Sequence, residues 1–275
     1  MVEMYLIRKD VVKRVVKFEG VLRADSPILV GTGERGPIKE VMKDLEGRPM
    51  IPGSSWKGVF RSSGERIARR KGLKVCSGLT NDNCLKNGGL DKVFLNSLRS
   101  DMDQAKRIAW NNTCINCKVF GTISILGQVR FLDSISQDFK LNTRAMTAIS
   151  RKDGSVVGGA LVTLEYADVG SRFPFTLFTY NLPNYALGYM ILIMEEIHNH
   201  LVQVGGNKSR GFGFLSFEKL SMEVLSGDQS LPKLDEDDME VKGSLDLRNL
   251  SGKEFFERAK PLMEAFRNVK ISYPS

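Results

Sequence analysis

Hydrophobic and polar residues alternate along several short stretches of this chain and recur at helical spacing along others. Because successive side chains of a strand point to opposite faces, the alternating stretches predict β-strands, over residues 13–22, 127–133 and 173–182. Apolar residues three or four positions apart predict helices, which begin behind Ser54 and span 184–204 and 251–268. The buried stripe expected for the second of these helices consists of Leu187, Ile191, Met194, Ile197 and Leu201.

These segments follow one another as strand, helix, strand, hairpin, strand, helix and strand. That order predicts an α+β fold with a ferredoxin-like (RRM-like) sheet-and-helix core, formed by one domain over 1–225. Residues 73–126 interrupt the order and are predicted to be an insertion. The dipeptide Asp153-Gly154 is a hairpin turn signal, and strand-like arms on both sides of it predict a protruding β-hairpin over about 143–174.

Charge divides the chain into a basic body and an acidic tail. The whole chain has a net charge of +8. Residues 226–275 contain eight Lys or Arg and ten Asp or Glu, so 1–225 carry +10. A basic body suits a polyanionic partner, although charge that only keeps the protein in solution is the alternative. The tail is predicted to be an exposed acidic linker over 226–246, followed by the helix at 251–268.

One stretch, 47–61, combines a turn, a helix start and cations. Its serines Ser54 and Ser55 are candidate helix N-caps, because a serine oxygen accepts from an N–H of the first turn. Lys57 and Arg61 follow and lie four residues apart, hence on one face. Free N–H groups, hydroxyls and cations together can hold phosphate. The alternative is an ordinary capped helix with a solvated basic face.

No targeting or membrane segment is expected in this sequence. The first four residues lead directly into a run of mixed charge, unlike a signal peptide. The longest apolar run, 189–194, is far too short to span a bilayer. We therefore expect a cytoplasmic protein with no membrane partner.

The insertion contains all four cysteines of the chain, Cys76, Cys84, Cys114 and Cys117. Cys114 and Cys117 have the CxxC spacing that lets two thiolates face one tetrahedral ion, and Cys76 and Cys84 can supply the other half. Disulfides are rare in a reducing compartment. The cysteines therefore predict a structural zinc site, with small buried hydrophobes as the alternative.

Two further segments present cations on predicted loops. Arg151 and Lys152 precede the hairpin turn, and apolar residues follow it. The cations can contact phosphates, and the apolar side chains can contact the faces of bases. Lys208, Ser209 and Arg210 lie in a glycine-rich loop, whose backbone can approach phosphates closely. A surface hairpin and a generic loop without partners are the respective alternatives.

Two of these segments resemble a known family. The run RPMIPGSSWKGVFRS resembles the signature of the RAMP superfamily, the RNA-binding proteins of CRISPR systems, and GGNKSRGFGFLSF resembles its glycine-rich loop. Within the superfamily the chain is most similar to backbone subunits of type III (Csm/Cmr-type) effector complexes, over roughly 12–220. The resemblance implies a crRNA-binding subunit that contacts target RNA, other subunits and copies of itself along the guide. It also implies that the hairpin is a thumb pressing into the guide–target duplex.

The same resemblance implies an RNA-cleaving aspartate in the loop after the first strand. This sequence has no aspartate between Asp25 and Asp44. Glu34 and Glu40 are the candidate catalytic carboxylates of a metal-dependent endoribonuclease, which would use a divalent ion such as magnesium. The alternative is that both are solvated loop charges and the subunit does not cut RNA.

A third hypothesis is a stand-alone crRNA-processing ribonuclease of the same superfamily. The two histidines of the chain, His198 and His200, lie two positions apart on a predicted helix. They therefore face different directions and cannot act on one ligand from one helix face. Their placement argues against histidine-based catalysis.

Overall fold

The computed structural model describes residues 4–8, 10–31, 33, 38–122, 125–241 and 245–274. Its main sheet has four antiparallel strands. Their order across the sheet is β4 (Val129–Phe131), β8 (Arg172–Tyr180), β1 (Val15–Ala24) and β9 (Leu215–Ser226). In β1 the alternating side chains of Val16, Phe18 and Leu22 are fully buried, as the sequence pattern predicts.

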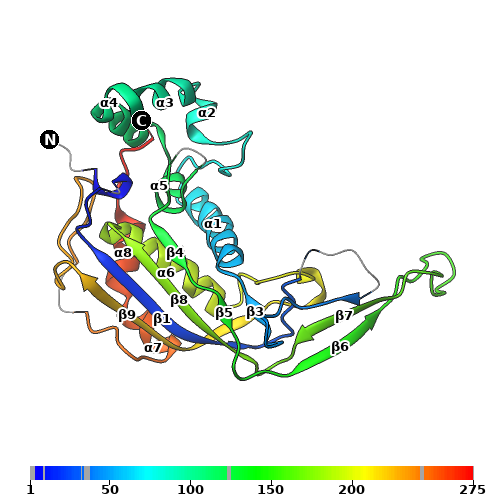
Figure 1. The fold of residues 1–275 in the computed structure, drawn as a ribbon. Helices are drawn as coiled ribbons and strands as arrows, with labels where there is room; N and C mark the ends of the chain where they lie inside the picture. Colours follow the sequence, from blue (N-terminus) through cyan, green and yellow to red (C-terminus); the bar gives the residue numbers. More distant parts are fainter. Residues whose placement is uncertain are drawn as a thin grey trace.

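Two long helices, α1 (Gly53–Arg70) and α6 (Asn184–His198), lie behind this sheet and leave its other face without a helix layer (Figure 1). Along the chain the core elements follow as β1, α1, β4, β8, α6 and β9. This order, together with the strand order across the sheet, is the ferredoxin-like arrangement that was predicted. No described helix combines the length and apolar character needed to cross a membrane.

The helix layer is fixed by aromatic packing. Trp56 and Phe60 of α1 are fully buried, and both rings contact Phe175 of β8, with centroids 5.4 and 5.8 Å apart. The indole nitrogen of Trp56 donates to Ser134 Oγ at 2.7 Å. Ser134 belongs to β5 (Ser134–Ile135), which pairs with β3 (Met50–Ile51) just before α1. The start of α1 is therefore held to the sheet from two directions.

Helix α6 ends at His198, six residues earlier than predicted. His200 has a φ of 59°, and the Leu201 N–H donates to the Glu196 carbonyl, so a left-handed residue closes the helix. Leu201 consequently leaves the buried stripe in which it was predicted and is 69% exposed. Gly205, which follows the predicted helix, lies against the Leu29 carbonyl.

A hairpin of β6 (Leu141–Met146) and β7 (Val162–Ala167) extends away from the body (Figure 1). Strand β2 (Ile38–Lys39) pairs with β7 in parallel. The hairpin matches the predicted segment over most of its length, although the last predicted residues already belong to β8. At its far end the main chain forms an isolated bridge between Ile149 and Val156.

The insertion is a helical subdomain at the far end of α1 from the hairpin (Figure 1). Its helices are α2 (Cys84–Asn87), α3 (Asp91–Ser100), α4 (Met102–Asn112) and α5 (Ile115–Phe120). Leu85, Phe94 and Ala109 belong to a small hydrophobic cluster of its own. The short 3-10 helix η1 (Tyr5–Ile7) packs against α4 and α5.

The C-terminal segment forms two helices instead of the single predicted one, α7 (Gly252–Arg258) and α8 (Lys260–Asn268). Pro261 lies in the first turn of α8, where its missing N–H costs nothing, but it cannot continue a hydrogen-bond ladder from α7. Ser251 and Glu254 form a capping box at the start of α7. Helix α8 packs on α6, where the rings of Phe266 and Tyr189 stack at 4.8 Å.

The predicted linker is exposed or partly exposed over most of its described residues, but Leu231 and Asp238 anchor it to the body. Leu231 and Asp238 are each only 3% exposed. The Asp238 carboxylate accepts from the backbone N–H groups of Leu234 and Met239, both at 2.9 Å. The Asn184 amide at the start of α6 donates to the Leu231 carbonyl. Because these bonds satisfy the buried groups, a segment of acidic composition packs into the body.

Asp235 is partly buried near Tyr273, and its carboxylate has fewer hydrogen-bond partners than that of Asp238. One carboxyl oxygen accepts from the Tyr185 hydroxyl at 2.9 Å, and that hydroxyl also contacts the hydroxyl of Tyr273 at 2.6 Å. The other carboxyl oxygen has no hydrogen-bond partner among the described residues. Burial, the largest cause, raises the pKa of Asp235 from 3.8 to about 7.

This pKa predicts how stability depends on pH. The folded state holds a proton on Asp235 that the unfolded state releases near pH 4, so the stabilisation by this group is complete below pH 4 and is lost as pH rises to about 7. Asp235→Asn should therefore unfold at a higher temperature than the wild type at pH 8, and the difference should vanish near pH 4. Thermal unfolding across this range measures it, with exposed Glu236→Gln as the control. An equal difference at both pH values would contradict the prediction.

Candidate nucleic-acid surface and cysteine cluster

Helix α1 begins without the predicted serine cap. The N-cap residue is Pro52, which has no capping side chain, and Ser54 and Ser55 lie within the first turn. The Gly53 N–H donates to the Asp133 carboxylate at 2.7 Å, so an acidic side chain already occupies part of the helix start. A side chain on Gly53 would clash with the Phe131 carbonyl, which explains the glycine at this position.

Lys57 and Arg61 have different surroundings although they lie one turn apart. Lys57 is exposed, and its ammonium has no carboxylate partner in the described part of the chain. Partial burial, and secondarily the charge of Arg61, lower the pKa of Lys57. Arg61 points into the protein, where Nε donates to the Ser77 carbonyl at 3.0 Å and Nη1 to the Gly121 carbonyl at 2.6 Å. Its guanidinium therefore connects α1 to the insertion and is not presented to a ligand with Lys57.

The structure brings the four predicted metal ligands together. The sulfur atoms of Cys76, Cys84, Cys114 and Cys117 lie within 4.8 Å of one another. Sγ–Sγ distances of 3.1 Å (Cys76–Cys117), 3.5 Å (Cys76–Cys84), 3.8 Å (Cys84–Cys117) and 3.9 Å (Cys76–Cys114) are present. Metal–sulfur bonds of about 2.3 Å at tetrahedral angles place sulfurs ~3.8 Å apart. The donor set therefore fits one tetrahedral ion.

The charges around the cluster also suit an anionic centre. Lys118 is fully buried, and its ammonium donates to the carbonyls of Trp110 and Thr113 at 2.7 and 2.6 Å. Arg61 Nη2 lies 4.0 Å from Cys117 Sγ. A divalent ion with four thiolates carries a net charge of −2, which two nearby cations offset. Burial lowers the pKa of Lys118, whereas thiolates at Cys114, Cys84 and Cys117 act to raise it, so an anionic cluster favours its ammonium form.

The glycine-rich loop presents its three predicted residues to solvent. Lys208, Ser209 and Arg210 form the 3-10 turn η2 (Lys208–Arg210) and are all exposed. The Gln203 amide holds the loop by donating to the carbonyls of Lys208 and Phe212 at 2.9 and 2.7 Å. Partial burial, and then the charge of Arg66 on α1, lower the pKa of Lys208. The loop thus lies beside the second half of α1.

The remaining predicted residues lie apart from α1 or outside the described chain. Arg151 and Lys152 are exposed at the end of the hairpin, near Val156, which is 65% exposed. Glu40 is exposed just after β2. Glu34 lies outside the described residues.

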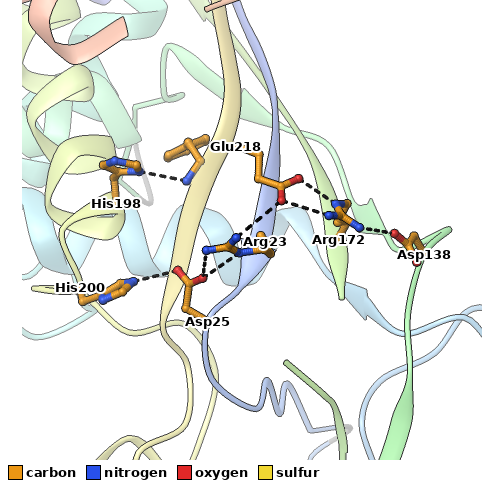
Figure 2. Close-up of polar contacts among 8 residues, drawn as sticks. Arg23, Asp25, Asp138, Arg172, His198, His200 and Glu218 are labelled. Carbon is orange, nitrogen blue, oxygen red and sulfur yellow. Dashed lines mark hydrogen bonds and ion pairs between the residues drawn. The ribbon is translucent and has the colours of Figure 1, made fainter. Parts of the chain in front are cut away.

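Asp25, at the end of β1, belongs to an ionic network that the sequence did not reveal (Figure 2). Its carboxylate contacts His200 Nε2 at 2.9 Å and Arg23 Nη2 at 2.7 Å. Burial raises the pKa of Asp25, but hydrogen bonds from Ser216, His200 and Arg23 outweigh it and leave the pKa lowered. The Asp25 carboxylate is thus already engaged by Arg23 and His200.

The network continues across the end of the sheet. Arg172 of β8 contacts Glu218 of β9 at 2.7 Å and Asp138 at 2.6 Å (Figure 2). These ion pairs neutralise the arginines that antiparallel pairing places opposite each other, Arg23 and Arg172. His198 Nδ1 accepts from the Phe217 N–H at 3.1 Å. Each of these side chains has a structural partner, and spacing along the sequence could not have revealed partners on four different segments.

The contacts of Arg61 predict that it supports metal retention. About one divalent ion per chain is expected. Arg61→Ala removes two charge-assisted hydrogen bonds and should lower stability by roughly 2 kcal/mol or more; it should also speed metal loss to a competing chelator. Elemental analysis and cobalt–thiolate absorbance measure retention, and Lys57→Ala, one turn away on the same helix, is the matched control. Equal retention in both variants would exclude the role of Arg61.

Comparison with known proteins identifies the family. The model of the RAMP superfamily matches residues 21–216, which is more than half of the chain. A search of curated proteins found no match. The family match runs from within β1 to the start of β9 and includes α1, the insertion, the hairpin, α6 and the glycine-rich loop. This chain therefore belongs to the RAMP superfamily.

Proposed function

We propose that this RAMP protein is a crRNA-binding backbone subunit of a type III CRISPR effector complex. It would hold the guide by its phosphates and display it for pairing with target RNA in antiviral defence. The observation that carries the proposal is the pair of exposed lysines, Lys57 on α1 and Lys208 in the glycine-rich loop. Neither has a carboxylate partner among the residues that the structure describes, so each is available to a polyanion.

Phosphate binding explains the chemistry of this surface best. Ser54 and Ser55 supply hydroxyls in the first turn of α1, while Ser209 and Arg210 supply a hydroxyl and a cation in the loop. Contacts of this kind position a nucleic-acid strand without reading its sequence. That property suits a subunit that must accept any guide.

The hairpin supports a role at the guide–target duplex. Arg151 and Lys152 at its end can contact phosphates, and the exposed side chains of Ile149 and Val156 can contact bases. The hairpin extends beyond the body (Figure 1), so it can reach a strand bound by a neighbouring copy. Other subunits of the complex are the further expected partners.

We propose that the cysteine cluster holds a structural zinc ion. Four thiolates are the ligand set of closed zinc sites, which leave no open position for a substrate. When bound, zinc would cross-link the segments of the insertion and would supply no reaction chemistry. Cys76 would anchor the chain after α1, Cys84 the start of α2, and Cys114 and Cys117 the start of α5.

A metal-dependent endoribonuclease is the alternative function of the same subunit. It would need a carboxylate that holds a divalent ion such as magnesium near the target phosphate. Glu40 is exposed and has no ion-pair partner in the described parts of the chain, which favours it over the engaged Asp25. The stand-alone processing ribonuclease is weakened because His198 and His200 both have structural partners.

RNA binding is expected to depend on salt but not on sequence. Each phosphate contact of a single strand contributes about 0.7 to the slope of log affinity against log salt. Lys57→Ala combined with Lys208→Ala should therefore lower that slope by about 1.4. The double variant should also bind RNAs of unrelated sequence more weakly, by the same factor for each. Fluorescence anisotropy at several salt concentrations measures it. Lys233→Ala combined with Lys253→Ala, exposed lysines of the tail, is the control; an equal effect there would refute the proposed surface.

The assembled complex should bind target RNA but cut it poorly. A glutamate reaches one methylene further than the aspartate of the resembled subunits, and metal geometry is sensitive to that difference. The assay is cleavage of a paired target with magnesium or manganese. Strong cleavage at regular intervals that disappears in Glu40→Ala or Glu34→Ala would establish the endoribonuclease instead.

A further inference from the structure

The four cysteines of the cluster are not equally accessible from solvent. Cys84 is partly exposed, whereas Cys76 is only 6% exposed and both Cys114 and Cys117 are fully buried. A small molecule in solution therefore meets the cluster at Cys84 first. A purely structural role would use all four sulfurs in the same way and does not explain why one of them lies at the surface.

Oxidation is the reaction open to an accessible cysteine that has further cysteines beside it. The thiolate is the nucleophile that attacks a peroxide, and a neighbouring thiolate then converts the product into a disulfide. The backbone N–H of Cys114 donates to Cys84 Sγ at 3.4 Å. A hydrogen bond to sulfur favours the thiolate over the thiol, so Cys84 combines access with the reactive form.

Cys76 is the partner that the geometry favours for Cys84. Their Sγ atoms lie 3.5 Å apart, compared with 3.8 Å between Cys84 and Cys117. The turn between Cys76 and Cys84 also has hydrogen bonds of its own. The Asp82 carboxylate accepts from the Ser77 N–H at 2.8 Å, and the Ser77 hydroxyl donates to the Asp82 carbonyl. These bonds hold the two cysteines near each other without help from a metal.

A disulfide between these two cysteines would connect less of the insertion than a metal ion does. Cys76 and Cys84 are separated only by residues 77–83, so their disulfide closes one short turn. The metal site also includes Cys114 and Cys117, at the start of α5. Exchange of the metal for this disulfide would therefore remove the cross-link between the two segments of the insertion.

We propose that the cysteine cluster is a peroxide-sensitive switch, in which Cys84 reacts first and then forms a disulfide with Cys76. This inference rests on the proposed zinc ion and adds a reaction of its ligands. The Cys84 thiolate attacks one oxygen of hydrogen peroxide, the O–O bond breaks, and hydroxide leaves a sulfenic acid behind. The Cys76 thiolate attacks the sulfur of that group and displaces a second hydroxide. Two thiolates thus lose two electrons, and one peroxide with two protons becomes two waters.

The oxidised cluster can no longer hold the ion. Cys114 and Cys117 alone are too few ligands for a closed tetrahedral zinc site, so the ion is released. A small dithiol reverses the change by thiol–disulfide exchange, after which zinc can bind again. The switch therefore has a metal-bound state with a cross-linked insertion and a disulfide state without that cross-link.

Hydrogen peroxide added to the zinc-loaded protein tests this switch. The wild type should lose its zinc, about one ion per chain, to a colour-forming chelator, and mass spectrometry after alkylation should find Cys76 joined to Cys84. Dithiothreitol with added zinc should reverse both changes. Cys84→His keeps a ligand for zinc but cannot form the disulfide, so this variant should retain its zinc under peroxide. Cys117→His is the matched control, which keeps the reactive pair and should still lose zinc.

The outcomes separate the switch from the zinc site on which it rests. If the wild type binds no zinc, the metal site is wrong, and the disulfide formed by the metal-free protein decides the pairing alone. If zinc is bound but peroxide does not release it, the switch is wrong and the metal site stands. A first disulfide that joins Cys84 to Cys114 or Cys117 would overturn the assigned pair. Should a histidine variant not hold zinc, the disulfide map of the wild type remains decisive.

Discussion

The close packing of α1 on the sheet and on α6 is the constraint on which the rest of this structure depends. Its start fits only because Gly53 has no side chain to meet the Phe131 carbonyl, and its middle because Gly64 has none to meet the Tyr189 hydroxyl. Between them, Trp56 and Phe60 fill the space against Phe175. With both glycines in contact, α1 cannot rotate or slide without losing aromatic contacts and the hydrogen bond to Ser134.

Because α1 is held in this position, its inner side contacts the insertion around the cysteine cluster and its outer side is exposed to solvent. On the inner side, Arg61 donates hydrogen bonds to the carbonyls of Ser77 and Gly121, which flank the cysteine cluster. Its outer side leaves Lys57 and Arg66 toward solvent. The Asn116 side chain strengthens the connection by donating to the Arg61 carbonyl. The insertion and the proposed RNA surface are therefore linked through α1.

The sequence predicted the elements of the core well because their signals are local. Alternation located β1, β4 and β8, and the cysteine spacing located a cluster whose sulfurs do meet. The prediction failed where the direction of a side chain depends on a partner that is distant in the sequence. Four-residue spacing placed Arg61 beside Lys57, but the direction of its side chain is set by carbonyls 16 and 60 positions away.

Predictions from apolar spacing and from composition also failed, at the end of α6 and in the acidic segment. The apolar spacing continues past His198, yet a left-handed His200 ends α6 and exposes Leu201. Acidic composition indicated a solvated linker, but Asp238 is buried because three backbone N–H groups lie within reach of its carboxylate. Composition describes the average residue of a segment, whereas burial depends on whether each polar group finds a partner.

Net charge alone does not locate a surface for a polyanion in this protein, because carboxylates neutralise part of the positive charge. At the end of the sheet, Arg23 and Arg172 are neutralised by carboxylates on neighbouring strands. The acidic tail cannot neutralise the body further, because part of its charge is folded inside with Asp238. Cations without an acidic partner in the described chain include Lys57 of α1 and Lys208 in the loop beside it, but also Lys233 and Lys253 of the tail. What sets α1, the loop and the end of the hairpin apart is that their glycines, hydroxyls and exposed apolar side chains also suit a nucleic acid.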